Sequence, residues 1–232
     1  MPAPDPQLTQ ARLDSADSSE SSGVPSSVPH PAVRRLSLYL RQLEAFAAQG
    51  RHTVSSRELG RALGLGDAQV RKDLANFGSF GQSGVGYRVE ELIPRLKRIL
   101  GVDRSWDVVL MGAGNVGRAL LAYRPFVEKG FRLVAVFDSD VRLHGQQFGE
   151  VMVQPPAEVG ETVRRLGARL AVIAVPAEAA QRACDALVAA GVRGILNFAP
   201  VNLNVPDGVA VNSVDLVVQL EQLAFQVNAD EK

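Results

Sequence analysis

The stretch Val108–Gly117, VVLMGAGNVG, decides the fold of this chain. Val108, Val109 and Leu110 predict a short buried strand, and three glycines follow at the spacing G-x-G-x-x-G. Residues 118–123 then predict a helix. In this arrangement the first glycine permits a tight turn, the second lets the backbone approach a pyrophosphate, and the third lets the helix pack close to the strand. Free N–H groups at the start of the helix would face the phosphates.

A second apolar run supports a dinucleotide site. Residues 133–137 predict another strand, and Asp138 follows the last glycine by about 20 residues, where such sites carry an acid that binds the ribose. A carboxylate repels a 2′-phosphate, and the nearest following arginine is Arg142, so NAD(H) is favoured over NADP(H). A glycine-rich turn without a ligand is the alternative. The residues predicted to hold the nucleotide are Gly112, Ala113, Gly114, Asn115, Val116, Gly117 and Asp138.

The rest of the C-terminal part alternates apolar strands with helices. Strands are expected at 151–153, 170–175, 194–198 and 209–211, and helices at 155–166 and 177–190. This alternation predicts an α/β fold, a Rossmann-like doubly wound parallel sheet covered on both faces, with its ligand at the carboxyl ends of the strands. Two of those ends hold the residues predicted to line a nicotinamide pocket, Val175, Pro176, Asn197 and Phe198.

The N-terminal part predicts a small helical unit. An amphipathic helix is expected at 33–49, and a second begins where Ser55 and Glu58 have capping-box spacing. After a glycine-bearing turn, Asp67 is expected to cap a third helix over 68–77, which completes a helix-turn-helix unit. The glycine-rich segment 77–89 predicts a β-hairpin, and 90–100 a closing helix. Together these elements predict a winged-helix DNA-binding domain.

The third helix separates an apolar from a polar face. Val70, Leu74 and Phe77 share the apolar face, whereas the polar face is assigned Gln69, Arg71, Lys72, Asp73 and Asn76. Arginine and lysine contact phosphates and guanine edges, and glutamine binds adenine. Residues 33–101 contain 12 Lys and Arg against 6 Asp and Glu, although the whole chain has 25 of each. This basic excess favours DNA contact over the alternative, a solvated basic surface.

The two ends of the chain differ in character. Residues 1–31 are rich in Pro, Ser, Asp and Gln and predict a disordered tail. Residues 214–227 predict a helix that is apolar around much of its girth, so we expect a partner subunit to bury it; docking onto its own sheet is the alternative. The resulting divisions are a tail at 1–31, a winged-helix domain at 32–101, a Rossmann domain at 102–212 and a C-terminal helix at 213–232.

Composition limits the compartment and the chemistry. No apolar run approaches the roughly 20 residues that span a membrane, and no secretion signal is evident, so the cytoplasm is expected. The single cysteine, Cys184, makes neither an internal disulfide nor a metal cluster; a buried thiol is favoured over a redox sensor.

Two classes of function compete. A dehydrogenase needs an acid–base group beside the nicotinamide and a substrate domain, but His30, His52 and His144 do not follow a late strand and no sequence remains for such a domain. A transcription factor that uses NADH and NAD⁺ as its signal fits the order of reader, sensor and dimerising helix, and it requires no catalytic residue. A nucleotide-binding module of the CoA-ligase kind would share the fold but would not explain the wing.

The chain resembles the Rex redox-sensing transcriptional repressors over residues 31–227. QVRKDL followed by FGSFGQSGVGY is the most specific match, and the others are RLSLYLRQLE, SSRELG, GAGNVGRALLAY, VFD, VPAEAAQ, GILNFAPV and NSVDLVVQLEQL. The resemblance implies a homodimer that exchanges C-terminal helices, each inserted between the two domains of the partner. It also implies that palindromic operators of respiratory and fermentative genes are repressed until NADH binds.

The resemblance also assigns roles to individual residues. Arg71 and Lys72 match the pair that contacts DNA, with Gln69 beside them, and Gly84, Gly86 and Tyr87 match the wing. Three further residues match a switch whose hydrogen bonds and ion pairs rearrange with the ligand, namely Arg41, Tyr123 and Asp215. One departure concerns the tip of the wing, which has no basic residue before Arg88, so its phosphate contacts are expected to be weaker.

Overall fold

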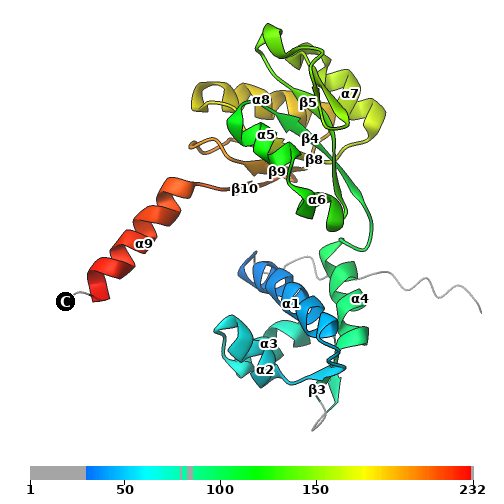
Figure 1. The fold of residues 1–232 in the computed structure, drawn as a ribbon, viewed down its shortest axis with the longest axis vertical. Helices are drawn as coiled ribbons and strands as arrows, with labels where there is room; N and C mark the ends of the chain where they lie inside the picture. The colour runs from blue at the N-terminus through cyan, green and yellow to red at the C-terminus, as the bar shows by residue number, and fades with distance from the viewer. Residues whose placement is uncertain (1–29, 79, 83–85, 231–232) are drawn as a thin grey trace, which may run out of the picture. The chain divides into compact units, whose positions relative to one another are not determined.

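The structure, a computed structural model, describes residues 30–78, 80–82 and 86–230. Its chain divides into two compact units, residues 1–100 and 101–232. Figure 1 labels the elements of both. The predicted tail lies outside the described residues except for its last two positions, which already belong to the first helix.

The first unit contains four helices and a three-stranded sheet. In chain order its elements are α1 His30–Ala48, β1 Thr53–Val54, α2 Ser56–Leu63, α3 Asp67–Ala75, β2 Gly81–Gln82, β3 Gly86–Arg88 and α4 Val89–Leu100. The sheet order is β1-β3-β2, antiparallel throughout. The hairpin of β2 and β3 confirms the predicted wing, but the two-residue strand β1 was not predicted. Each helix contributes buried side chains to one core, among them Leu36, Leu43, Leu59, Leu74, Leu92 and Leu96.

The predicted capping box at the start of α2 is present. Ser55 Oγ accepts a hydrogen bond from the backbone N–H of Glu58 at 3.2 Å, and the Glu58 carboxylate accepts one from the backbone N–H of Ser55 at 2.8 Å. The carboxylate also accepts a hydrogen bond from the Ser55 hydroxyl at 2.7 Å. The bonds from the Ser55 N–H and hydroxyl, together with an ion pair to Arg51, lower the pKa of Glu58 to about 2. The start of α2 is therefore stabilised by a charged carboxylate.

The start of α3 differs from the prediction. Gly66 is the residue that caps the helix, and Asp67 is its first helical residue. Asp67 instead forms an ion pair with Arg71 one turn later, at 2.7 Å. An acid in the first turn is still favourable, because it lies near the positive end of the helix dipole.

The second unit contains a seven-stranded sheet. Its strands are β4 Trp106–Met111, β5 Phe131–Phe137, β6 Gln147–Phe148, β7 Val151–Gln154, β8 Leu170–Ile173, β9 Gly194–Asn197 and β10 Ala210–Ser213. The order is β10-β9-β8-β4-β5-β7-β6, and only the last pair is antiparallel. The helical segments are α5 Asn115–Leu121, α6 Arg124–Glu128, η1 Val141–Leu143, η2 Pro156–Glu158, α7 Val159–Leu166, α8 Ala177–Ala190 and α9 Leu216–Asp230.

The central strands are buried on both faces, as predicted for a doubly wound sheet. Val109 and Met111 of β4 pack in one cluster with α7 and α8. Val108 and Leu110 pack in another cluster with Leu120 and Leu121 of α5. Successive side chains of a strand point to opposite faces, so a continuous apolar run indicates cover on both sides. The connection from β9 to β10 has no helix, and its apolar residues Val201, Leu203 and Val205 pack on the side of α7 and α8.

The C-terminal helix α9 is exposed along its length. Residues 216–229 are all exposed, including seven large apolar side chains, Leu216, Val217, Val218, Leu220, Leu223, Phe225 and Val227. The alternative of docking on its own sheet is therefore wrong for this single chain. An apolar surface of this kind marks a contact with another molecule.

Candidate functional site

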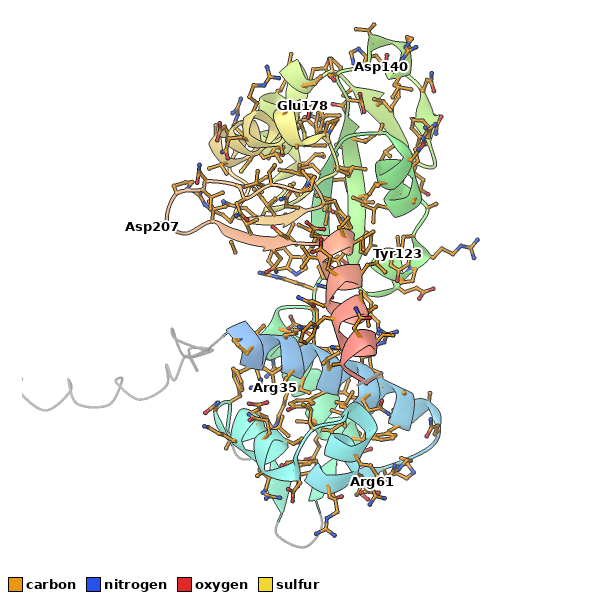
Figure 2. The ribbon with its side chains drawn as sticks, turned by 90° about the vertical axis from the view of Figure 1, so that its left-hand side faces the viewer. Arg35, Arg61, Tyr123, Asp140, Glu178 and Asp207 are labelled. Atoms are coloured by element: carbon orange, nitrogen blue, oxygen red, sulfur yellow. The ribbon has the colours of Figure 1, made fainter. Side chains whose placement is uncertain are left out.

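A cavity of about 930 Å³ opens where three neighbouring strands end. Its walls come from the residues after β4, β5 and β8 and from one side of α8. The chain moves from β4 to β5 on one side and later to β8 on the other, so this is the point where the strand order reverses. Open α/β sheets bind ligands at such a point. Figure 2 shows Asp140 and Glu178 at this end of the unit.

The glycine turn has the backbone that its sequence predicts. Gly112 has φ +103°, and a Cβ there would strike the carbonyl of Ala174. A Cβ on Gly117 would strike the carbonyl oxygen of Gly112, so this glycine allows α5 to approach β4. Gly114 caps α5, and the space where its Cβ would lie is open. The turn therefore presents bare backbone toward the cavity.

Asp138 is joined to the glycine turn. Its Oδ2 accepts a hydrogen bond from the backbone N–H of Ala113 at 2.6 Å, and its Oδ1 accepts one from Asp140 N–H at 2.8 Å. A ring nitrogen of His144 lies 2.8 Å from the carbonyl oxygen of Asp138. Each carboxylate oxygen has a further lone pair, so Asp138 can still accept hydrogen bonds from a ribose.

The cavity brings together only some of the predicted cofactor residues. Those that line it are Gly112, Ala113, Gly114, Asp138, Val175 and Pro176. Asn115, Val116 and Gly117 form the first turn of α5 and are not among its walls. Asn197 and Phe198 are not among them either. The fully buried amide of Asn197 donates to Ala199 O at 3.1 Å and Val201 O at 2.9 Å, so it shapes the turn after β9.

Several charged residues at the cavity were not predicted. Arg118, Asp140 and Arg182 line it together with Arg142. Arg118 directly follows Gly117, the last glycine of the motif, and this position was the one sequence signal that could have identified it. Asp140 binds Arg142 through two hydrogen bonds, Nε to Oδ1 at 2.9 Å and Nη2 to Oδ2 at 2.7 Å. These hydrogen bonds, and that from the Arg142 backbone, lower the pKa of Asp140 to about 2.

The predicted DNA-binding residues fall into two groups. Arg71 and Lys72 are exposed on α3, and Arg71 donates to Asp67 and, at 3.1 Å, to Ser56 Oγ. Gly84 lies outside the described residues. Gly86 passes close to β1, because a Cβ there would lie 2.6 Å from Val54 O. Tyr87 is buried, with its ring against Gly81, so it supports the base of the wing rather than its surface.

Asp73 corrects the predicted polar face of α3. It is buried and accepts hydrogen bonds from Arg35 Nε at 2.5 Å, Arg35 Nη2 at 2.8 Å, Tyr39 Oη at 2.8 Å and Gln69 Nε2 at 2.8 Å. Burial raises the pKa of Asp73, but these hydrogen bonds outweigh burial and hold it below its ordinary value. Burial and the bond to Asp73 raise the pKa of Tyr39. We call Arg35, Tyr39, Gln69 and Asp73 the α1–α3 cluster.

The three predicted switch residues have distinct surroundings. Arg41 is exposed on α1. Tyr123 is 52% exposed and packs edge-to-face on Phe126 at 5.1 Å between ring centres. Asp215 Oδ1 accepts hydrogen bonds from Val217 N–H at 2.9 Å and Val218 N–H at 3.1 Å, which caps the start of α9. This capping role was not predicted, although Asp directly before the first helical residue is typical of it.

Residues 30–78, 80–82 and 86–230 contain neither a cluster of metal-binding side chains nor a membrane-spanning helix. In that part of the chain, no three His, Cys, Asp or Glu side chains gather in a way that would hold a metal ion. None of the helices described there has the length and hydropathy needed to cross a membrane.

Two family models match the chain. One, described as a putative DNA-binding protein N-terminus, matches residues 27–75, and the other, described as a CoA binding domain, matches 103–201. A winged-helix unit joined to a Rossmann-like sheet with a pocket at its reversal point defines a class, that of nucleotide-responsive DNA-binding proteins.

Similar proteins identify the family within that class. The redox-sensing transcriptional repressor Rex of Carboxydothermus hydrogenoformans is 49% identical over 203 residues, which cover 88% of this chain and 98% of the relative. Rex of Streptomyces coelicolor is 47% identical over 198 residues, covering 85% and 77%. This chain belongs to the Rex family of redox-sensing transcriptional repressors. Because these relatives are named repressors, the regulator interpretation holds and the dehydrogenase alternative does not.

Solved structures of the same family have the same fold. The crystal structure of RSP in complex with β-NAD⁺ and operator DNA matches with a TM-score of 0.85 and 38% identity, covering 89% of this chain and 95% of that one. The crystal structure of RSP in complex with β-NADH matches with a TM-score of 0.81 and 36% identity, covering 89% and 97%. The predicted α/β fold with an N-terminal winged-helix domain is confirmed.

Proposed function

We propose that this chain is a homodimeric repressor that binds palindromic operator DNA in the cytoplasm and is released when NADH binds. The observation that carries the proposal is a cavity behind a Gly112–Gly117 turn, in the same chain as an exposed basic pair on α3. The crystal structures of RSP support it, since one holds β-NAD⁺ and operator DNA and another holds β-NADH.

The nucleotide is proposed to bind with its diphosphate over the glycine turn and its adenosine ribose at Asp138. NADH and NAD⁺ share these parts, so contacts to them cannot distinguish the two forms. The nicotinamide ring differs, because it is cationic when oxidised and neutral when reduced. An apolar wall that includes Ala174, Val175 and Pro176 penalises the cation. A preference of about 3 kcal/mol for the neutral ring would exceed a hundredfold in affinity.

The dimer is proposed to form through α9. Its seven exposed apolar side chains need a cover that the chain itself does not give them. Each large apolar side chain that becomes buried contributes about 1.5–3 kcal/mol, so several of them suffice for a stable assembly. An exchanged helix would also carry Asp215 to the partner, where Tyr123 and Arg41 are proposed to compete for its carboxylate.

Operator binding is proposed to depend on Arg71 and Lys72, with the wing beside them. Both side chains are exposed on one short helix, whereas Gln69 is held by Asp73 at 2.8 Å. Two such helices in a dimer read half-sites that are roughly 34 Å apart, one turn of the duplex. Release by NADH follows if the reduced ring draws the two nucleotide-binding domains together and thereby changes this spacing.

The proposal is tested with the full chain and a palindromic duplex that it selects from a random pool. Fluorescence anisotropy of the labelled duplex is followed while NADH or NAD⁺ is added to the complex. NADH is expected to release the duplex at a much lower concentration than NAD⁺. Equal release by both forms would reject redox sensing, and failure to select any duplex would reject the DNA-binding assignment.

A further inference from the structure

The edge of the cavity that receives the ribose carries two acids and one arginine on a single loop. Asp138 directly follows β5, Asp140 lies two residues further on, and Arg142 lies in the 3₁₀ turn η1. All three line the cavity. The side chain of Asp140 is 31% exposed and that of Arg142 is 85% exposed, so Arg142 reaches into solvent while Asp140 is anchored.

The backbone of this loop fixes Asp140. Its N–H donates to Asp138 Oδ1, and its own Oδ1 accepts the N–H of Arg142 at 3.0 Å, which caps η1. The guanidinium of Arg142 then folds back onto the same carboxylate with a second pair of hydrogen bonds. Both Asp140 oxygens are thus used by Arg142, and the positive charge of Arg142 is neutralised where it stands.

This pairing matters because dinucleotides differ at the ribose 2′ position. NAD(H) has a hydroxyl there and NADP(H) a phosphate, which Rossmann domains accept through an arginine near the end of the second strand. Arg142 has the position and the exposure for that task. Asp140 accepts hydrogen bonds from the Nε and Nη2 edge of Arg142, an edge that could otherwise bind a phosphate with two hydrogen bonds. A second carboxylate beside Asp138 also adds repulsion to a phosphate dianion.

We infer that Asp140 is a specificity-determining residue, which excludes 2′-phosphorylated dinucleotides by occupying Arg142. The inference rests on the proposed dinucleotide site. The exclusion has two parts: the charge of Asp140 repels the phosphate, and its hydrogen bonds occupy the Nε and Nη2 edge of Arg142 and offset its charge. Removing that one charge converts Arg142 from a neutralised group into a phosphate ligand.

The test uses the full chain and the variant Asp140→Asn. Asparagine keeps the oxygen that caps η1 and loses the charge, so the loop retains its shape. Binding of NADH, NADPH and 2′,5′-ADP is measured by calorimetry for both proteins. A newly available charged contact is expected to raise affinity for NADPH and 2′,5′-ADP by about tenfold, while affinity for NADH changes little.

Two controls identify the source of the gain. The double variant Asp140→Asn/Arg142→Ala should lose it, because no guanidinium remains. Asp207→Asn makes the same change of charge at an exposed residue that does not line the cavity (Figure 2), and it should leave all affinities unchanged. Thermal unfolding of each variant checks that the fold is intact.

The outcomes separate this inference from the proposed function. Unchanged NADPH affinity in Asp140→Asn, a gain that survives loss of Arg142, or the same gain in Asp207→Asn would each overturn the inference while NADH binding still stands. If the unaltered chain binds no NADH, the proposed dinucleotide site fails and this inference fails with it.

Discussion

Replacing Asp73 with asparagine is expected to destabilise the N-terminal unit strongly. The Asp73 carboxylate is 2% exposed and accepts four hydrogen bonds. The three from Arg35 and Tyr39 join α1 to α3, and the one from Gln69 lies within α3. Asparagine has nearly the same size but one acceptor oxygen and no charge. The change therefore removes the interactions of the cluster without opening a cavity.

The size of the effect follows from the burial of each partner. Removing one member of a buried ion pair costs about 3–5 kcal/mol when the other charge stays buried. Arg35 is 25% exposed and can turn toward water, whereas the Tyr39 hydroxyl belongs to a residue with no exposed surface. We therefore expect a loss of about 2–3 kcal/mol, which lowers the midpoint of a unit of this size by about 10–20 °C.

Differential scanning calorimetry of the full chain measures this loss as a lower midpoint temperature for the unfolding of the N-terminal unit. Asp67→Asn is the matched control, because it makes the same change on the same helix at an exposed ion pair and should shift the midpoint little. Tyr39→Phe should have an intermediate effect, since it removes a single hydrogen bond. If Asp73→Asn is no less stable than Asp67→Asn, the cluster does not hold α3 to α1 and the reasoning fails.

Acid should also destabilise the N-terminal unit, because protonation removes the charge of Asp73 as the substitution does. The folded-state pKa of Asp73 lies below its ordinary value of 3.8, so the stability it gives is fully present above that value and is lost as the pH falls through the lower one. Glu58 acts in the same direction, with a folded-state pKa of about 2 against 4.5. The N-terminal unit should lose stability between about pH 5 and pH 2, and Asp73→Asn should lose less over that range.

The remaining predictions concern function. Lys72→Ala should weaken operator binding and reduce the dependence of the binding constant on salt concentration by about one released counterion. Lys129→Ala, in the other unit, should leave this salt dependence unchanged. An unaltered salt dependence for Lys72→Ala would exclude a phosphate contact. Tyr123→Phe and Asp215→Asn should keep operator affinity but blunt release by NADH, and loss of DNA binding itself would contradict a switch role. Leu220→Asp with Phe225→Asp should convert the proposed dimer to a monomer in light scattering, because charge is placed on the exposed apolar surface of α9.

Much of the fold was predictable because its signals are local. The glycine turn, the capping box of Ser55 and Glu58, and α8 with its terminal Gly191 each depend on a few adjacent residues. The continuous apolar strands predicted a sheet with both faces covered. Several short elements escaped prediction. Both β1 and β6 have two residues, η1 is a single 3₁₀ turn, and α6 is a five-residue helix whose only signal is Pro125 near its start.

The errors at the candidate sites have a common physical cause. Asp73 follows Val70 by three residues, so it borders the apolar stripe of α3, and a carboxylate turns inward there only because Arg35 and Tyr39 supply donors from a distant helix. Tyr87 and Asn197 were assigned by position, but each is engaged by its own neighbours. A single sequence shows local periodic patterns, but it does not show which hydrogen-bond partners come from distant parts of the chain.

The α1–α3 cluster has a mechanical consequence. Helix α1 presents Arg41 to solvent six positions after Arg35, whose side chain is bonded to Asp73 on α3. We therefore expect α1 and α3 to move together if a ligand acts on Arg41, because separating them would break the hydrogen bonds to the buried Asp73 carboxylate. A ligand that acts on Arg41 would then reorient the N-terminal unit while its core stays packed. Repression could be lifted and restored repeatedly without any unfolding step.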